Sequence, residues 1–251
     1  MAVEQQIPDR PTADRGDGGG DDAADRIDDV ERAHRGILFA TALATAAVVI
    51  AAPLHSDRAR TVTTYSVGYF VGSLATGSIN RKLAKALVKL APPQLELQEI
   101  PIGDLPLYSW DYDADYPPAG RALKDAIAAV DAVLFVSPEY NRSVPGALKN
   151  AIDWASRPYG QNSFTRKPSA VIGTSPGKIG TAVGQQHLRS ILGFCNSPQM
   201  NAPEAYIQFT PGLITEEGEV TEASTEEFLR SYMRELAGFI QRVYTVLPRG
   251  M

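Results

Sequence analysis

A segment rich in glycine and hydroxyl groups, GSLATGSIN at residues 72–80, has the composition of an anion-binding loop. An apolar helical pattern begins directly after it, so its free backbone N–H groups would lie at the positive end of a helix dipole. The segment matches neither GxxxxGK[ST], which holds nucleoside triphosphates, nor GxGxxG, which holds dinucleotides. We interpret it as a site for a single phosphate, the alternative being a plain turn in which Ser78 caps the helix. The candidate binding residues are Ser73, Leu74, Ala75, Thr76, Gly77, Ser78 and Asn80.

Two further segments combine glycine or proline with polar side chains. SPEYNRSVPG, at residues 137–146, has a proline on either side of a polar and aromatic stretch. The prolines would hold backbone N–H and C=O groups in set positions, as the edge of a flat heterocycle requires. Tyr140 would add an apolar wall. GTSPGKIG, at residues 173–180, has the same glycine and hydroxyl character as the first segment. Taken singly, each segment is also compatible with an ordinary structural turn.

The hydrophobic periodicity predicts a scaffold that would bring these segments together. Strands are expected at residues 65–71, 95–100, 132–136, 169–173 and 206–209, and helices at 78–90, 118–130, 145–156, 180–194 and 225–243. This alternation predicts an α/β fold, a doubly wound sheet of five parallel strands with helices on both faces. In the strand order 2-1-3-4-5, as in flavodoxin with FMN, ligands bind where the order reverses, outside the carboxyl ends of the first and third strands. The first two segments follow those two strands.

Composition excludes several other classes of protein. The 251 residues carry a net charge of -5, which argues against a general nucleic-acid binder. The single cysteine, Cys195, cannot form an internal disulfide or a thiolate metal cluster, and we expect a buried, inert thiol. The three histidines are far apart in sequence, so we expect no metal site. This cysteine usage fits a reducing cytoplasm.

The first 62 residues differ in composition from the rest. Residues 1–35 are rich in Asp, Gly, Ala and Arg, which predicts a disordered acidic leader. Residues 36–53 form a short apolar run with three interpretations: a signal peptide, a short membrane anchor, or sequence upstream of a true start near Val62. The acidic leader and the Ala-rich composition favour the third. We therefore expect a leader at residues 1–62, one folded domain at 63–245 and a tail at 246–251.

The segment SPEYNRSVPGALKNAIDW, residues 137–154, resembles the NAD(P)H-dependent FMN reductases, a family whose members include bacterial quinone and chromate reductases and azoreductase relatives. VGSLATGSINRKLAKAL, residues 71–87, resembles that family's phosphate loop. The resemblance covers residues 63 to 243 and implies a flavodoxin-like fold, one FMN, and NADPH or NADH as co-substrate. It implies that Ser73, Ser78 and Asn80 hold the phosphate. It implies that the isoalloxazine ring is lined by Pro138, Glu139, Tyr140, Asn141, Ser175 and Gly177.

The resemblance also implies an activity and an assembly. Hydride would pass from NAD(P)H to the flavin and then to an acceptor, with no catalytic side chain required. Quinones are the expected acceptors, with chromate, azo compounds and free flavin as further candidates, and the chain would form a homodimer or homotetramer. Two alternatives remain: a flavodoxin-type electron carrier without an NAD(P)H site, which would normally be more acidic, and a non-enzymatic flavin-binding module.

The chain departs from the family pattern in two places. Many relatives have an arginine after Gly-Ser-Leu, where this chain has Ala75, so the phosphate lacks that cation. Arg81 and Lys82, one turn away, are the candidate replacements. The loop at residues 175–177 is one residue shorter than the family pattern, which alters the ring contact expected there.

Removal of residues 1–61 is expected to leave flavin binding and turnover unchanged, because the leader has too little apolar surface to offset its chain entropy. The measurement compares flavin content and NADPH-dependent quinone turnover of residues 62–251 with those of the full chain. Loss of flavin or of activity in the shorter protein would show that the leader has a structural role.

Overall fold

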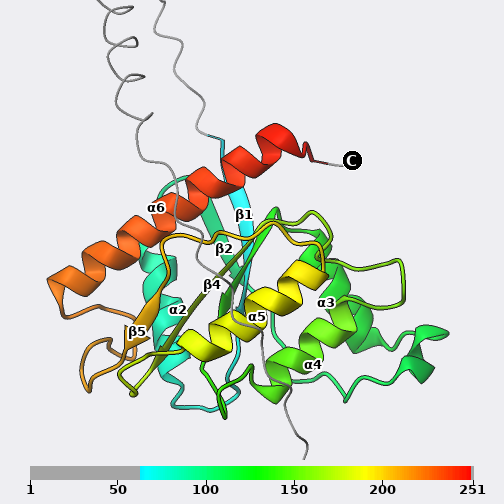
Figure 1. Cartoon of the computed structure of the whole chain (residues 1–251), viewed down its shortest axis with the longest axis horizontal. Helices are drawn as coiled ribbons and strands as arrows, with labels where there is room; N and C mark the ends of the chain where they lie inside the picture. Colours follow the sequence, from blue (N-terminus) through cyan, green and yellow to red (C-terminus); the bar gives the residue numbers. More distant parts are fainter. Residues whose placement is uncertain (1–62, 250–251) are drawn as a thin grey trace, which may run out of the picture. The chain divides into compact units, whose positions relative to one another are not determined.

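The computed structural model describes residues 63–249, so the predictions for residues 1–62 and for the last two residues of the tail fall outside it. The described chain is built on one sheet of five parallel strands in the order β2-β1-β3-β4-β5 (Figure 1). The strands are β1 (Tyr65–Val71), β2 (Leu95–Glu99), β3 (Ala132–Val136), β4 (Ser169–Ser175) and β5 (Tyr206–Gln208). The predicted strand order is confirmed, and it places the carboxyl end of β1 beside that of β3.

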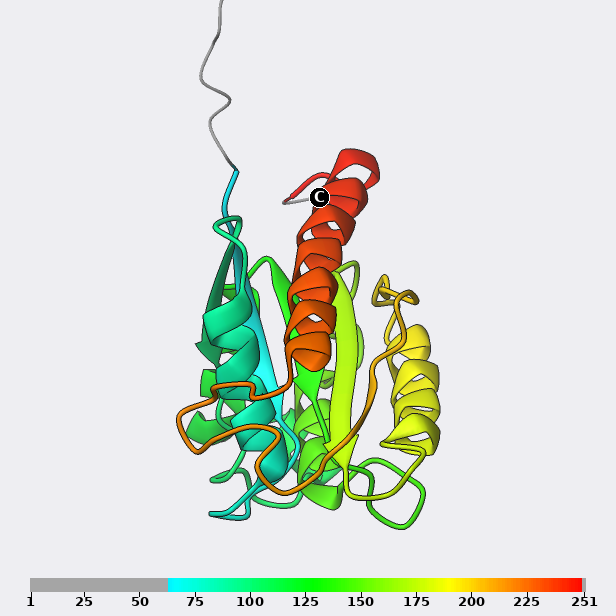
Figure 2. The same cartoon turned by 90° about the vertical axis from the view of Figure 1, so that its left-hand side faces the viewer.

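The helices of the described chain cover both faces of this sheet (Figure 2). On one face lie α2 (Ile79–Leu90) and α6 (Ala223–Val246). On the other lie α3 (Pro118–Ala128), α4 (Gly146–Ala155) and α5 (Ala182–Phe194). A short 3-10 helix, η1 (Trp110–Asp113), lies in the connection from β2 to α3. The predicted doubly wound α/β fold is therefore confirmed.

Strand periodicity divides the apolar residues between two cores. In β1, Val67 and Val71 pack in the core under α2 and α6. Phe70, on the opposite face, stacks on Phe135 of β3 with ring centroids 4.9 Å apart. All five residues of β3 are buried, which explains its uninterrupted apolar sequence, since a central parallel strand is covered on both faces.

Of the element boundaries that differ from the sequence-based prediction by two or more residues, two lie beside the third polar segment. β4 continues two residues further, to Ser175, because Gly173, Thr174 and Ser175 pair with β5, a tertiary contact that local sequence does not encode. α5 begins at Ala182, two residues later than predicted. Gly180 adopts a φ of 58°, a left-handed conformation that lies outside the α-helix.

Among residues 63–249, no helix combines the length and apolarity needed to cross a membrane.

Gly173→Ala is expected to lower the free energy of unfolding by about 1–3 kcal/mol. A Cβ atom at this position would lie 2.1 Å from the carbonyl oxygen of Ser137, and that backbone cannot move without shifting the end of β3 against β4. Urea titration of the apoprotein measures the change. Gly146→Ala is the matched control, since its Cβ would meet no atom within 4 Å at the start of α4. Equal stability of the two variants would contradict the prediction.

Candidate functional site

The three polar loops meet around one cavity at the carboxyl ends of β1, β3 and β4. Its volume is about 270 Å³. The lining residues are Ser73, Gly77, Ser78, Ile79, Asn80, Pro138, Glu139, Tyr140, Thr174, Ser175 and Pro176. Because β1, β3 and β4 are neighbours and all run in the same direction, their following loops emerge side by side. The sheet thus brings together segments that are far apart in sequence, such as those that contain Ser73 and Pro176.

Most of the predicted binding residues line this cavity. Five belong to the same loops but lie outside the lining: Leu74, Ala75, Thr76, Asn141 and Gly177. Three lining residues were not singled out from the sequence: Ile79, Thr174 and Pro176. The available signal was their position, since Ile79 opens α2, and Thr174 and Pro176 flank Ser175 within the polar segment 173–180.

Two buried hydroxyl groups lie in the first loop. Ser73 and Ser78 are only 5% and 7% exposed, although neither belongs to the apolar core. Ser78 is the N-cap of α2, and its hydroxyl accepts a hydrogen bond from the backbone N–H of Arg81 at 3.3 Å. The helix cap named in the alternative interpretation of this segment is therefore present, and it fixes the direction in which α2 leaves the loop.

The same loop presents unused donors at the N-terminus of α2. The backbone N–H groups of Leu74, Thr76 and Gly77 have no acceptor among residues 63–249. The first turn of α2 carries no acidic side chain that would repel an anion. A Cβ atom added to Gly77 would meet nothing within 4 Å, so the space beside this backbone is open. The donors, the helix dipole and the open space together suit a small anion such as a phosphate group.

Asn80 connects the first loop to the third. Its Nδ2 donates to the carbonyl oxygen of Thr174 at 2.9 Å, and its Oδ1 accepts from the Thr174 N–H at 3.0 Å. Both hydrogen bonds are buried. The amide therefore holds the start of α2 against the end of β4, which leaves it one N–H for a ligand.

The two cations suggested as replacements for the missing arginine are engaged elsewhere. Arg81 Nη1 lies 2.9 Å from both carboxylate oxygens of Glu99, and Lys82 Nζ lies 2.6 Å from Glu216 Oε1. Glu99 also influences Tyr69: burial raises the pKa of that phenol, and the carboxylate raises it further. In this structure neither cation is directed to the first loop.

The second loop is a tight reverse turn. Tyr140 and Ser143 exchange backbone hydrogen bonds of 3.0 and 2.9 Å. Between them, Asn141 and Arg142 both have left-handed φ angles, 50° and 64°. Two consecutive positive φ values define a type I′ turn, which asparagine tolerates and arginine rarely adopts. This turn leaves Tyr140 at the cavity wall, half-exposed.

The start of α5 holds this turn in place, a feature that the sequence did not reveal. Glu139, whose side chain is 7% exposed, accepts a hydrogen bond from the backbone N–H of Gly184 at 2.9 Å. Arg142 Nη1 lies 3.3 Å from the same carboxylate. His187, an exposed residue of α5, bonds Ser143 Oγ through Nδ1 at 3.0 Å. The carboxylate of Glu139 thus serves as an anion at a helix N-terminus, where the dipole favours negative charge.

The single cysteine lies outside this cavity. Cys195 follows α5, is buried, and is a free thiol. Burial raises its pKa, so the reactive thiolate is disfavoured. The predicted buried thiol is confirmed.

Comparisons with known proteins find FMN reductases, quinone reductases and a related NAD(P)H oxidoreductase. The family model described as NADPH-dependent FMN reductase matches residues 65–211. The chain is 46% identical over 175 residues to a 2-hydroxy-1,4-benzoquinone reductase from a Burkholderia species, covering 70% of this chain and 96% of the relative. It is 47% identical over 178 residues to a quinone reductase from Pseudomonas putida, covering 70% and 95%. Among solved structures, FerB from Paracoccus denitrificans, a flavoenzyme NAD(P)H:(acceptor) oxidoreductase, is 48% identical with a TM-score of 0.69, covering 71% of this chain and 98% of FerB.

Glu139→Ala is expected to lower the free energy of unfolding of the apoprotein by about 1–2 kcal/mol, because the Gly184 N–H loses its acceptor and the helix loses its anion. Glu139→Gln keeps an acceptor for the hydrogen bond and is expected to lower the free energy of unfolding by about half as much. Glu222→Ala is the matched control, since its carboxylate lies at the start of α6 on an exposed surface and accepts hydrogen bonds only from the hydroxyls of Ser224 and Thr225, not from the helix backbone. Urea titration without added flavin gives the three values. A Glu139→Ala variant as stable as the control would contradict this role.

Proposed function

The chain belongs to the NADPH-dependent FMN reductase family, and from that membership we propose that it is an FMN-containing oxidoreductase that passes electrons from NADPH or NADH to quinones or similar small acceptors. The names of its relatives support this class of acceptor. The observation that carries the proposal is the meeting of three polar loops around one cavity, with unused N–H donors at the start of α2. The cavity lies at the switch point of the strand order, where ligands bind in sheets of this kind.

The described residues fit FMN, a flavin with a single phosphate. In the proposed complex the phosphate accepts hydrogen bonds from the free N–H groups of the first loop and from the hydroxyls of Ser73 and Ser78. Thr76 lies in the same loop, and Asn80 contributes its remaining N–H. The absence of an acidic side chain in the first turn of α2 supports this placement.

The isoalloxazine ring is proposed to lie between the second and third loops. Pro138, Tyr140 and Asn141 would border one side, and Ser175 and Gly177 the other. Glu139 contributes its backbone, because its carboxylate already accepts from α5. The tight turn after it gives the loop a defined shape before any ligand binds, which reduces the ordering cost of binding.

FMN, when bound, would supply the capacity for hydride transfer between the nicotinamide and the acceptor. The chain's own residues bind the cofactor and position it. The first loop anchors the phosphate, the second holds the ring edge, and the half-exposed Tyr140 shields the ring from water. No side chain is assigned as an acid, a base or a nucleophile.

We further propose that the protein forms a homodimer or homotetramer and acts in the cytoplasm. The single buried thiol is compatible with a reducing compartment. A membrane association would depend on residues 36–53, which lie outside the described part of the chain.

Denaturation of the purified protein is expected to release FMN, at one molecule per chain. The first loop offers its donors to one phosphate, which FMN carries as a monoester. Chromatography of the released flavin identifies it. Release of FAD, or of no flavin, would contradict the proposal.

Initial-rate kinetics are expected to follow a ping-pong pattern, because one cavity would receive the nicotinamide and the acceptor in turn. Plots of reciprocal rate against reciprocal NADPH at several quinone concentrations should be parallel, and clearly intersecting lines would rule out this order. A stopped-flow experiment separates the reductase from the electron carrier: the carrier's flavin would remain oxidised on mixing with NADPH or NADH.

A further inference from the structure

A hairpin between β5 and α6 lies across α2 (Figure 2). We call residues 212–221 the strap; it turns back on itself through an antiparallel bridge between Ile214 and Val220. Leu213 and Ile214 are 6% and 1% exposed and belong to the core under α2 and α6. The strap is therefore an ordered hairpin with an apolar anchor, and its position over the helix is defined.

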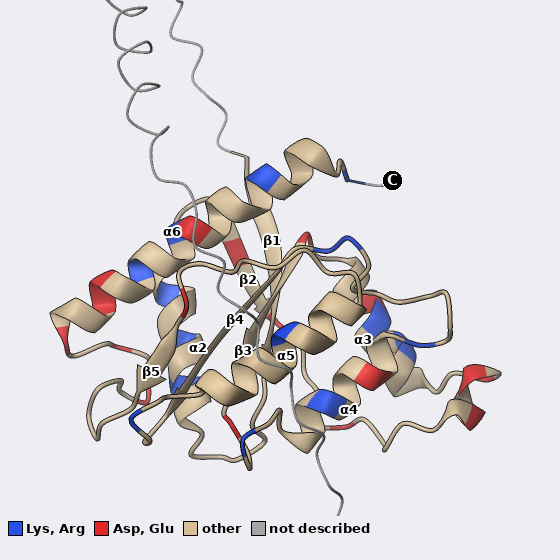
Figure 3. Ribbon diagram, viewed as in Figure 1, with Lys and Arg blue, Asp and Glu red and all other residues tan. Residues whose placement is uncertain are grey.

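The tip of the strap is held against α2, a helix rich in basic residues (Figure 3). Lys85 Nζ donates to the backbone carbonyl oxygen of Glu216 at 2.6 Å, and Lys89 forms an ion pair with Glu219. A Cβ atom added to Gly218 would lie 2.7 Å from the Cβ of Lys85, so the turn packs directly on the helix. None of these contacts uses the side chain of Glu216, which is therefore not needed to hold the strap in place.

The carboxylate of Glu216 has a different partner, Lys82 at the start of α2. Lys82 Nζ lies 2.6 Å from Glu216 Oε1. The side chain of Lys82 is only 20% exposed, whereas that of Glu216 is 69% exposed. Water can therefore solvate the carboxylate when this ion pair opens, and an ion pair with so exposed a partner contributes little to stability. Lys82 can leave Glu216 at a small cost.

Lys82 is also well placed to reach the first loop. It follows Ser78 by four residues, and residues with this spacing lie above one another on a helix. Helical side chains lean toward the N-terminus, so the flexible four-carbon stem of Lys82 can extend back toward Ser78, which lines the cavity. Arg81 differs, because its guanidinium contacts both oxygens of Glu99 at the end of β2. In the strand order, β2 lies on the far side of β1 from β3 and β4, whose loops line the cavity.

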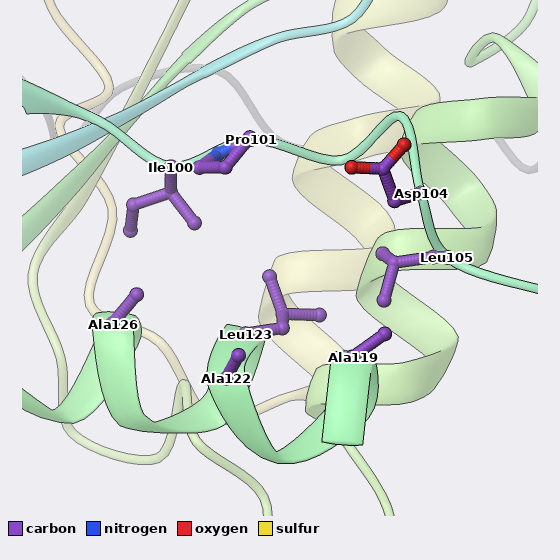
Figure 4. A pocket seen from close by; sticks show the side chains of 8 residues that line it. All are labelled: Ile100, Pro101, Asp104, Leu105, Ala119, Ala122, Leu123 and Ala126. Atoms are coloured by element: carbon purple, nitrogen blue, oxygen red, sulfur yellow. The ribbon is translucent and has the colours of Figure 1, made fainter. Parts of the chain in front are cut away.

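A second cavity of the described chain does not suit a phosphate. An apolar cleft of about 320 Å³ lies between α3 and the segment that follows β2 (Figure 4). Among residues 63–249, its one charged lining residue is Asp104, whose carboxylate would repel an anion. The cleft shares no lining residue with the cavity at the three polar loops. The start of α2, with its free N–H groups and its lysine, is the better position for the phosphate.

We propose that Lys82 provides the cation for the phosphate of FMN and that Glu216 competes with the phosphate for it. Without flavin, the ammonium pairs with Glu216, which the strap holds in place. In the complex, Lys82 pairs with the phosphate and the carboxylate of Glu216 is left in water. Glu216 therefore weakens flavin binding, because the ammonium leaves it when FMN binds. This inference rests on the proposed FMN site, and it adds the side chain and the competitor that set the affinity for the phosphate.

The first test compares flavin affinities of the full chain after its flavin has been removed, measured by quenching of flavin fluorescence. Lys82→Met keeps an aliphatic stem and removes the charge, so it is expected to raise the dissociation constant of FMN about tenfold or more. The constant for riboflavin, which has no phosphate, should stay within about twofold of the wild-type value. Arg81→Met is the matched control. It removes the same charge from the same turn, and it should change the constant for FMN by less than about threefold, because Arg81 is held at Glu99.

Glu216→Gln separates this role from a merely structural one by the sign of its effect. Loss of an ion pair that only held the strap would weaken FMN binding or leave it unchanged. The proposed competition predicts the opposite, a dissociation constant for FMN that is lower by about threefold or more. This gain should disappear in the Lys82→Met background. Glu217→Gln, which removes the same charge from an exposed neighbour, is the matched control and should give little change.

The outcomes distinguish this inference from the proposed function. Wild-type protein that binds no FMN would overturn both. Normal FMN binding by the wild type, with Lys82→Met equally tight, would overturn the role of Lys82 alone. A Glu216→Gln variant that binds FMN more weakly would overturn the competition. Circular dichroism verifies the folding of each variant, and Lys82→Gln, which can still donate to Glu216, is a milder variant with the same expected direction.

Discussion

The hydrogen bonds between the Asn80 amide and the backbone of Thr174 hold the site together. They join the start of α2 to the end of β4, across the intervening β3, and both are buried. Leaving a buried polar group without a partner costs about 1–3 kcal/mol, so α2 cannot move away from β4 without a large loss of stability. The spacing between the first and third loops is therefore fixed before a ligand arrives. The second loop, which follows β3, lies between them.

The first loop can bind an anion through its backbone N–H groups, although neither Arg81 nor Lys82 is directed toward it. Ala75 stands where many relatives have arginine, and Arg81 and Lys82 are paired with Glu99 and Glu216. Ion pairs at exposed positions contribute only about 0–1 kcal/mol, so these two ion pairs can break and allow the cations to reorient. The free N–H groups at the start of α2, however, are already in position and need no rearrangement. In the proposed complex they provide the main recognition of the phosphate, with the helix dipole in support.

Much of this structure could be predicted from the sequence, and most of the features that could not be predicted depend on partners far away in the chain. Periodicity located every strand and helix of the described sheet, since apolar patterning reports burial directly. The longer β4 depends on pairing with β5, and the roles of Asn80 and Glu139 depend on Thr174 and Gly184. Each involves a partner 30 or more residues away, whose identity only the folded chain reveals.

The loops were recognisable from glycine, proline and hydroxyl content, but the function of individual side chains within them was not. Asn80 was expected at the phosphate, yet most of its hydrogen-bonding capacity serves the link between α2 and β4. Glu139 was expected at the flavin ring, whereas in the structure its carboxylate accepts a hydrogen bond from the Gly184 N–H at the start of α5. Local composition identifies where a ligand can bind, and tertiary contacts decide which atoms remain available for it.

The central claim is that the N-terminus of α2 binds the phosphate of FMN, and comparing FMN with riboflavin tests it most directly. Riboflavin has the same ring system and lacks only the phosphate. Two charge-assisted hydrogen bonds worth about 1.5–3 kcal/mol each predict that the apoprotein binds FMN at least about 100-fold more tightly, as measured by quenching of flavin fluorescence. Equal affinities for the two flavins would contradict the account.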